Sequence, residues 1–449
     1  MSPKPPPPVR RILLFLIGGT LLASGSAPAE TLMETYRQAV ANDPKLASAR
    51  LDHQAAEEVV RQARAGLLPT VIADLEKTQE RQNILSSQNT VIGAGTTTFP
   101  VRQHTLTVTQ PIFKKAVWDR LAQTEAGVRQ AYANRLAAEQ GLMVRVATAY
   151  LGVLAARDSL GFAGAEKGAV TKQLQLVEER VARGLAASGA LHEARARHAQ
   201  VSARELEAAN VLADAQQGLR EMTGSLITHY RGIREDIPLQ MPEPAIADRW
   251  AETALDQNLA VEAKRQAVEA AQKEIDRQRA GYLPTVNLVG TYNNRKQGGT
   301  LFGGGSHVET GDLSLKVSIP IFEGGLTTAL TDEAVARYQK SLQDLELERR
   351  GTERQARAAY QGVVSSIAQV QALRQGVVSQ TSALELKQEG YKAGVATVLA
   401  VLDSQRDLYM AKRDYAKARY DYLLYRLRLK QAAGSLSEED LELVGRLAD

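Results

Sequence analysis

The sequence contains no cysteine, and after its N-terminal segment it contains no long apolar run. The absence of cysteine excludes disulfide bonds and a lipid anchor on an N-terminal cysteine. No later stretch reaches the roughly 18 consecutive apolar residues of a transmembrane helix. An exported chain of 449 residues without these features has to be held together by packing and assembly.

The N-terminus has the pattern of a secretory signal peptide. Three cations precede the apolar run 12–22, and a small-residue segment follows and ends at Ala29. We therefore expect residues 1–29 to be removed, so that the mature chain begins at Glu30. The apolar run is too short for the alternative, an uncleaved anchor helix. The formal net charge of +4 falls to about +1 without these three cations, so charge gives no indication of nucleic-acid binding.

A seven-residue motif occurs twice. Residues 65–71 read Ala-Gly-Leu-Leu-Pro-Thr-Val, and residues 280–286 read Ala-Gly-Tyr-Leu-Pro-Thr-Val. Proline cannot lie inside a helix because it lacks the N–H group and its ring clashes with the preceding turn, and glycine favours a helix end. Each copy therefore predicts a junction, at Pro69 and at Pro284, where an alanine-rich helix ends and a strand begins.

This duplication extends over nearly the whole chain. Pro-Ile-Phe recurs about 209 positions apart and predicts the return from strand to helix at Pro111 and at Pro320. The expected organisation is a first repeat over 30–229, a proline-containing connector over 230–248, a second repeat over 249–435 and a C-terminal tail over 436–449. The expected strands lie near 70–82, 104–111, 285–295 and 312–320, with loops at 83–103 and 297–306.

Long helical runs follow each pair of strands, and shorter ones, at 31–64 and 249–279, precede them. The run from Phe113 to Arg183 has roughly 70 residues, on the order of 100 Å if unbroken. Apolar residues that recur every seventh position predict coiled-coil packing along such helices. These positions are Val363, Val370, Val377, Leu384 and Tyr391 in the second repeat, and Val153, Leu160, Leu174 and Val181 in the first, where Lys167 is the exception.

Each long helix is expected to turn back at a glycine. Gly184 and Gly394 suit the left-handed position that follows a helix end. Ser188 and Thr397 suit the N-cap of the next helix. The helical hairpin tips are thus expected near 183–190 and 392–398, about one helix length away from the strands.

The strands alternate apolar and polar residues, as strands do that face lipid on one side and water on the other. In the second repeat Leu313, Leu315 and Val317 alternate with Ser314 and Lys316. A sheet inside a bilayer must close, because an open edge leaves backbone groups unpaired, and about four strands are too few for one chain to form a barrel. The pattern favours a transmembrane β-barrel shared between chains over the alternative, a soluble sheet packed on one helix face.

Together these features resemble the TolC family of outer-membrane channel proteins. The similarity covers essentially 30–449 and is carried by Glu30-Thr31-Leu32-Met33, Leu68-Pro69, Thr107 to Phe113, Ile319 to Gly325 and the tract from Ala393 to Leu423. It implies a mainly α protein with membrane β, in which a homotrimer shares a barrel of about twelve strands in the cell outer membrane. That barrel would continue into a long coiled-coil helical barrel in the periplasm.

The resemblance also implies partners. They are outer-membrane lipid around the barrel, a periplasmic adaptor at the hairpin tips, and an inner-membrane ABC or proton-driven transporter behind the adaptor. The tip residues that would contact the adaptor are Gly184, Leu185, Ser188, Gly394, Val395 and Thr397.

The resemblance places the tunnel entrance just after the second tip. Asp403 matches one of two acids that face the pore in this family, whereas Ala400 stands at the position of the other. Tyr391 matches a linking tyrosine, but Ala396 and Ala190 replace a linking arginine and a linking aspartate. We therefore expect an entrance held mainly by coiled-coil packing, with one ring of Asp403 from three chains. The alternative for Asp403 is a solvated acid on the helix surface.

The sequence predicts a channel rather than an enzyme. We find no nucleophile–base pair, carboxylate dyad, cofactor motif or metal site, and His192 and His198 are six residues apart and so lie on different sides of a helix. The predicted function is a passive exit duct for type I protein secretion, multidrug efflux or both. The alternative is a periplasmic coiled-coil adaptor or scaffold without a pore.

Overall fold

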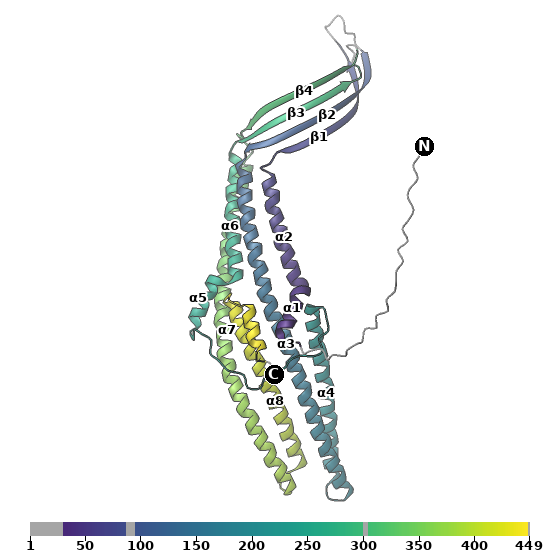
Figure 1. Ribbon diagram of the computed structural model, residues 1–449, viewed down its shortest axis with the longest axis vertical. Helices are drawn as coiled ribbons and strands as arrows, with labels where there is room; N and C mark the ends of the chain where they lie inside the picture. The colour runs from purple at the N-terminus through teal and green to yellow at the C-terminus, as the bar shows by residue number, and fades with distance from the viewer. Residues whose placement is uncertain (1–29, 87–94, 300–303, 448–449) are drawn as a thin grey trace, which may run out of the picture.

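The structure is a computed structural model that describes residues 30–86, 95–299 and 304–447. The molecule is long and narrow, with a sheet at one end, helices along its length and two helical hairpin tips at the other end (Figure 1). The predicted signal peptide, residues 1–29, lies outside the described residues. No helix in the described ranges is both long and apolar enough to cross a membrane.

The sheet has four antiparallel strands in the order β1-β2-β3-β4. They are β1 (Thr70–Ile84), β2 (Gly95–Phe113), β3 (Thr285–Gln297) and β4 (Ser306–Ser318). Each repeat contributes one hairpin, and β2 pairs with β3 to join the two halves of the chain, with Val108 opposite Gly290. Among the residues that the structure describes, the two outer strands, β1 and β4, each leave one edge without a partner.

The strands extend further than the sequence pattern predicts. The expected loop at 83–103 is wrong over much of its length, because β2 already begins at Gly95. Threonines at 96–98 suit a strand, and the burial of Phe99 and Val101 on one face continues the alternation toward the loop. β4 likewise begins at Ser306, before the expected start near 312.

The four junction prolines do not occupy equivalent places. Pro69 and Pro284 directly precede β1 and β3, and Pro320 follows the end of β4 by two residues. Pro111 lies inside β2 rather than at its end, next to a shift of register with β3 between Pro111 and Phe113. A proline can remain in a strand at such an irregularity, because the ladder there does not need its missing N–H group.

Two helical hairpins form the long axis. They consist of α3 (Lys115–Ala182) with α4 (Ser188–Thr223), and α7 (Leu326–Lys392) with α8 (Val398–Ala432). α3 and α7 have 68 and 67 residues, which is about 100 Å each. α3 also packs along α8, so the two hairpins lie side by side (Figure 1). Val363 and Val370 of the predicted heptad positions are buried, and Tyr391 near the tip is half-buried.

The shorter helical run of each repeat is two helices rather than the single one expected. The helices are α1 (Leu32–Asn42), α2 (Pro44–Ala65), α5 (Ala247–Gln257) and α6 (Leu259–Arg279). Asp43 and Asn258 have extended backbone at the two breaks. Each caps the next helix, because its side chain accepts a hydrogen bond from the N–H of Leu46 (2.7 Å) or of Ala260 (2.9 Å).

The glycines of the repeated motif allow close packing rather than a left-handed turn. Gly66 has φ −66° at the end of α2. A Cβ atom there would lie 3.0 Å from Cγ1 of Val117 in α3, and one on Gly281 would lie 3.0 Å from Cγ2 of Thr327 in α7. The motif therefore brings the first turn of each long helix against the end of the preceding helix.

The connector and the C-terminal segment pack around the middle of the helices. Glu30 pairs with Tyr230 in an isolated parallel bridge, and the Tyr150 hydroxyl lies 2.9 Å from the carbonyl oxygens of Glu30 and Arg231. The predicted tail contains a helix, α9 (Glu438–Gly445), whose Leu441 is fully buried. These contacts anchor the helices midway between the sheet and the hairpin tips.

Candidate functional site

The two hairpin tips have the same backbone geometry. Gly184 has φ +69° and Gly394 has φ +78°, the left-handed conformation that the sequence predicts. The N–H of Leu185 donates to the carbonyl of Arg180 at 2.8 Å, and that of Val395 to the carbonyl of Gly390 at 2.9 Å. These bonds satisfy the last carbonyls of α3 and α7 and reverse the chain within a few residues.

The residues that begin α4 and α8 differ. Thr397 is the N-cap of α8, and its side chain accepts a hydrogen bond from the N–H of Ala400 at 3.2 Å, as expected. The expectation for Ser188 is wrong by one position. Ala187 occupies the N-cap of α4 and has no side chain that could accept such a bond, while Ser188 is the first helical residue.

Large apolar side chains stand at the extreme end of each tip. Leu185 is 69 % exposed and Val395 is 84 % exposed. A side chain that points into water at the end of a rigid hairpin contributes nothing to this chain's own core. The tips therefore present two apolar contacts to whatever lies beyond them.

Apolar packing joins the two hairpins directly above the tips. Val170, Val177, Ala194 and Val201 of the first hairpin form one cluster with Val398 and Leu402 of α8. Tyr391 and Ala190 lie against this cluster. The Arg180 guanidinium also lies 5.1 Å from the centre of the Tyr391 ring, so Tyr391 joins α7 to α3 by a cation–π contact.

An ion-pair network lies on the next turns of the same helices. We call Glu166, Arg197, Arg204, Asp403 and Arg406 the entrance cluster. Asp403 lies 3.5 Å from Arg406 on its own helix and 4.0 Å from Arg197 on α4. Glu166 on α3 lies 3.9 Å from Arg197 and 3.6 Å from Arg204. The cluster thus links α3, α4 and α8, so polar contacts as well as packing hold the two hairpins together.

The centre of the entrance cluster is buried. Glu166 is 5 % exposed and Arg197 is 9 % exposed, whereas Asp403 is exposed enough to contact solvent. Burial lowers the pKa of Arg197, while the charges of Glu166 and Asp403 act in the opposite direction. A buried guanidinium needs such carboxylates, because an unpaired buried charge is strongly unfavourable.

Sequence reasoning missed Glu166 and Arg197, although one signal was present. The heptad pattern of α3 fails at Lys167, and the structure buries the neighbouring Glu166 instead. Lys167 is half-buried and lies 2.6 Å from Glu205 of α4. A charged residue in a core register position therefore marked a polar layer of the coiled coil.

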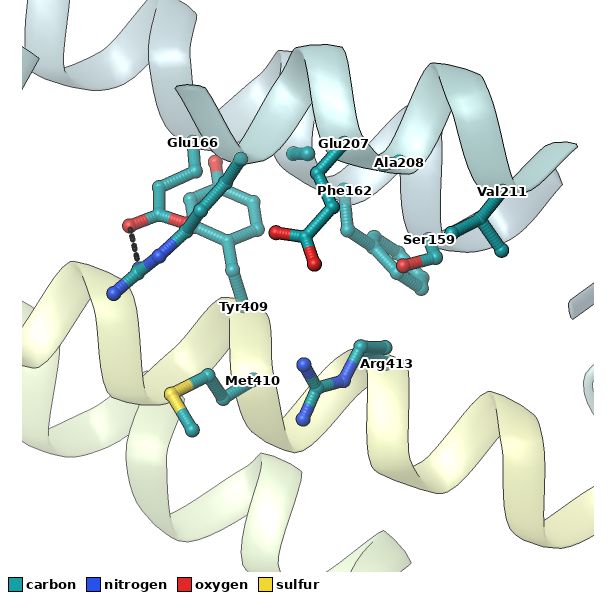
Figure 2. Close-up of a pocket in the computed structure, with 11 residues that line it drawn as sticks. Ser159, Phe162, Glu166, Glu207, Ala208, Val211, Tyr409, Met410 and Arg413 are labelled. Carbon is teal, nitrogen blue, oxygen red and sulfur yellow. Dashed lines mark ion pairs between the residues drawn. The ribbon is translucent and has the colours of Figure 1, made fainter. Parts of the chain in front are cut away.

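A cavity of about 370 Å³ adjoins the entrance cluster on the side away from the tips. Figure 2 shows Phe162 of α3 and Met410 of α8 at this cavity, with Glu207 and Arg413 on opposite walls and Glu166 at one end. Burial raises the pKa of Tyr409, and the negative charge of Glu166 adds to this effect. The cavity lies between the two hairpins, where any relative movement of α8 against α3 and α4 would change its shape.

Comparisons with known proteins agree on one family. A model of the outer membrane efflux protein family matches residues 35–225 and 250–435, one segment in each repeat. The chain is 33 % identical to the outer membrane protein TolC of Vibrio cholerae, over 96 % of this chain and 97 % of that protein. It is 30 % identical to the alkaline protease secretion protein AprF of Pseudomonas aeruginosa, over 97 % and 91 % of the two chains.

The fold is also similar to that of solved channels. The Campylobacter jejuni CmeC outer membrane channel matches with a TM-score of 0.79 at 14 % identity, over 94 % of this chain and 90 % of that one. At this identity the structural likeness shows the fold alone, whereas the sequence matches show the family. The chain therefore belongs to the outer membrane efflux protein family and is a TolC-like protein of the outer membrane, with its long helices as the periplasmic part.

Proposed function

We propose that the protein is the passive exit duct of a tripartite export system. In this proposal three copies form a continuous channel, a periplasmic adaptor holds the hairpin tips, and an inner-membrane ABC or proton-driven transporter supplies the energy. The single observation that carries the proposal is the family match, which covers both repeats. It applies to a chain that has a sheet at one end and two helical hairpin tips at the other.

The open sheet supports assembly into a trimer. β1 and β4 each have an edge that no other described strand pairs with, and strand edges inside a bilayer have to be paired. Leu75 and Leu313 on the sheet are each 77 % exposed, which suits contact with lipid and does not suit contact with water. Three copies in which β4 of one chain pairs with β1 of the next would close a barrel of about twelve strands.

The tips support contact with an adaptor. Leu185 and Val395 are exposed apolar residues, and the glycines beside them fix the turns that present them. In the proposed complex Gly184, Leu185, Ser188, Gly394, Val395 and Thr397 form the adaptor-contacting surface. An adaptor that binds both tips could move the two hairpins apart and so open the entrance.

The relatives suggest two uses for the duct. AprF and the proteases secretion protein PrtF of Dickeya chrysanthemi are named for protein secretion, the latter 27 % identical. BepC of Brucella suis, 23 % identical, is named an outer membrane efflux protein. We propose secretion or efflux on this basis, and the identity of the co-purifying transporter would decide between them.

The proposal predicts an assembly that conducts ions. Detergent-extracted mature protein should have about three times the mass of one chain and should give stable conductance in planar bilayers. Native mass spectrometry and single-channel recording would measure these two properties. A monomer that salt or carbonate releases from membranes, and that conducts nothing, would contradict the duct and favour a periplasmic scaffold.

We propose that Asp403 faces the lumen in this assembly and forms one acidic ring. Replacement of Asp403 by Asn should lower the permeability ratio of cations to anions by at least about twofold, because fixed charges at a constriction set ion selectivity. Arg197 and Arg406 keep Glu166 and Asp407 as partners after the substitution, so the ratio should fall without reversing. Bi-ionic reversal potentials would measure it.

Glu385→Gln is the matched control for this prediction. Glu385 is an exposed acid on α7 that lies as many residues before Gly394 as Asp403 lies after it. It should leave the selectivity unchanged if α8 rather than α7 lines the entrance. An equal effect of both substitutions, or no effect of Asp403→Asn, would assign Asp403 to the solvated outer surface.

A further inference from the structure

One face of the sheet carries a basic side chain at the same position on every strand. Arg81 lies eleven residues after the start of β1, and Lys296 lies eleven after the start of β3. Arg102 lies eleven residues before the end of β2, and His307 lies eleven before the end of β4. In the pairing register, however, it is Lys77 rather than Arg81 that lies in one row with Arg102, Lys296 and His307. We call Lys77, Arg102 and Lys296, together with Arg81, which lies four residues farther from the helices on β1, the cation belt.

These residues share one face of the sheet. Side chains alternate along a strand, and the register places Lys77, Arg102, Lys296 and His307 in one row across the sheet. On β2, Arg102 is exposed, whereas its neighbours Val101 and Phe99 on the other face are only 6 % and 3 % exposed. Arg81 follows Lys77 by four residues and so lies on the same face.

Charge is distributed unequally between the two faces. By the same alternation the other face of the sheet carries the acids Asp74, Glu76, Glu80 and Asp312, and Arg295 there lies 3.7 Å from Glu80. Glu309 is an acid on the cation-belt face. The Asn294 amide donates a hydrogen bond to the Glu309 carboxylate at 2.8 Å.

The belt cations have no ionic partner in the part of the chain that the structure describes. Among the described residues, none of Lys77, Arg81, Arg102 and Lys296 forms an ion pair. Residues 87–94 and 300–303 lie outside the described residues, and their sequence contains no Asp or Glu. Unpaired basic side chains gathered on one face are thus available to an anion from outside the chain.

The distance from the helix-side end of the sheet to the cation belt matches the height of the lipid-facing band of a membrane barrel. From the start of β3 to Lys296 the chain advances eleven residues. This corresponds to about 36 Å along the strand, or about 28 Å in height at a tilt of about 40°. Apolar residues of the same face lie between the belt and the helices, among them Val286 and Leu288 on β3 and Leu313 and Leu315 on β4. A lipid-facing apolar band is about 25 Å tall, so the belt stands where the lipid headgroups of the leaflet farther from the helices lie.

We propose that the cation belt binds the phosphate groups of lipid headgroups in that leaflet. The inference rests on the proposed function only in so far as the sheet crosses the membrane. A phosphate offers charge-assisted hydrogen bonds to Arg and Lys, and Arg102 can bind two phosphate oxygens at once. Arg102 and Lys296 are directly opposite each other on β2 and β3, close enough to share one phosphate.

The test compares two matched double variants in the full-length trimer. Arg102→Gln with Lys296→Gln removes two cations from the cation-belt face, and Arg295→Gln with Lys316→Gln removes two from the other face. Protein in neutral detergent would be titrated with lipid A, a glycolipid with two phosphates, and bound copies counted by native mass spectrometry. We expect roughly tenfold weaker binding for the first variant and wild-type binding for the second.

Several results would overturn the proposal. Equal lipid A binding by both variants would show that the cation belt does not bind lipid A. Displacement of lipid A by inorganic phosphate at equal concentration would show a site for free anions only. If the first variant fails to fold, the wild-type protein still decides, because lipid A binding that does not weaken with rising salt would exclude an ionic belt. Normal conductance of the first variant would separate these outcomes from a failure of the duct itself.

Discussion

Gly434→Ala should destabilise the protein far more than the same substitution at Gly224, its counterpart in the first repeat. Both glycines have φ +75° and end a helix, α8 and α4 respectively. An alanine in this conformation costs about 1–2 kcal/mol at either position. The difference lies in the surroundings of the added Cβ atom.

At Gly434 the new Cβ atom would lie 2.3 Å from the carbonyl oxygen of Gln257 and 2.9 Å from the backbone nitrogen of Asn258. Both are backbone atoms at the break between α5 and α6, so no side chain can rotate away. At Gly224 the nearest atom is the Asn42 Cβ at 3.4 Å. Relief of such an overlap by backbone movement adds about 1–3 kcal/mol, so the Gly434 variant should lose about twice as much stability.

Thermal and guanidinium unfolding in the same detergent would measure both variants. The Gly224 variant is the control, because it has the same backbone conformation without the overlap. Similar losses in the two variants would mean that the Gly434 turn can move away from the α5–α6 break. That result would also weaken the view that the end of α8 fixes the position of α6.

The sequence predicts the features of this fold that depend on local chemistry. Gly184 and Gly394 are left-handed because few other residues tolerate that conformation, and the seven-residue period at Val363 and Val370 reflects continuous packing. The breaks at Asp43 and Asn258 were missed because the composition on both sides is equally helical. Only the side chains that cap the next helix distinguish these positions.

The ion pairs around Asp403 were predictable only in part. The position of Asp403 near the second tip follows from the sequence around Gly394. Its neighbours Arg197 and Glu166 lie on other helices, and a charge on a long helix looks the same in sequence whether it faces water or another helix. The expectation of packing alone therefore omitted a polar layer that the register of α3 against α4 and α8 creates.

Asp43→Ala should be the second strongly destabilising substitution. Asp43 is 3 % exposed, caps α2 through the N–H of Leu46, and accepts hydrogen bonds from both terminal nitrogens of Arg145 at 2.9 Å. Loss of a cap costs about 1 kcal/mol, and removal of one partner from a buried ion pair costs up to about 3–5 kcal/mol. Since Arg145 can still reach water, we expect a total near 3 kcal/mol, about half of it for Asp43→Asn, which keeps a capping oxygen.

The difference between wild type and Asp43→Asn should depend on pH. Burial acts to raise the pKa of Asp43, but the hydrogen bonds from Arg145 and Leu46 outweigh it and lower the pKa below the ordinary value of 3.8. A lowered pKa in the folded state stabilises the protein above the unfolded-state value, and this stabilisation is lost as the pH falls through the folded-state value. Wild type should therefore exceed the Asn variant in stability at pH 6 and lose that advantage progressively below about pH 4.

The second repeat provides the control, because the uncharged Asn258 caps a helix there as Asp43 does in the first repeat. Asn258 caps α6 through Ala260, and its amide donates to the carbonyl of Ala432 at 2.9 Å. Asn258→Ala should lose stability by an amount that does not change between pH 6 and pH 3.5, since Asn does not titrate. A wild-type advantage over Asp43→Asn that stayed constant over the same range would mean that Asp43 acts as a neutral cap as well. The two repeats would then break their first helices in the same way, and the ion pair with Arg145 would contribute nothing to holding α2 against α3.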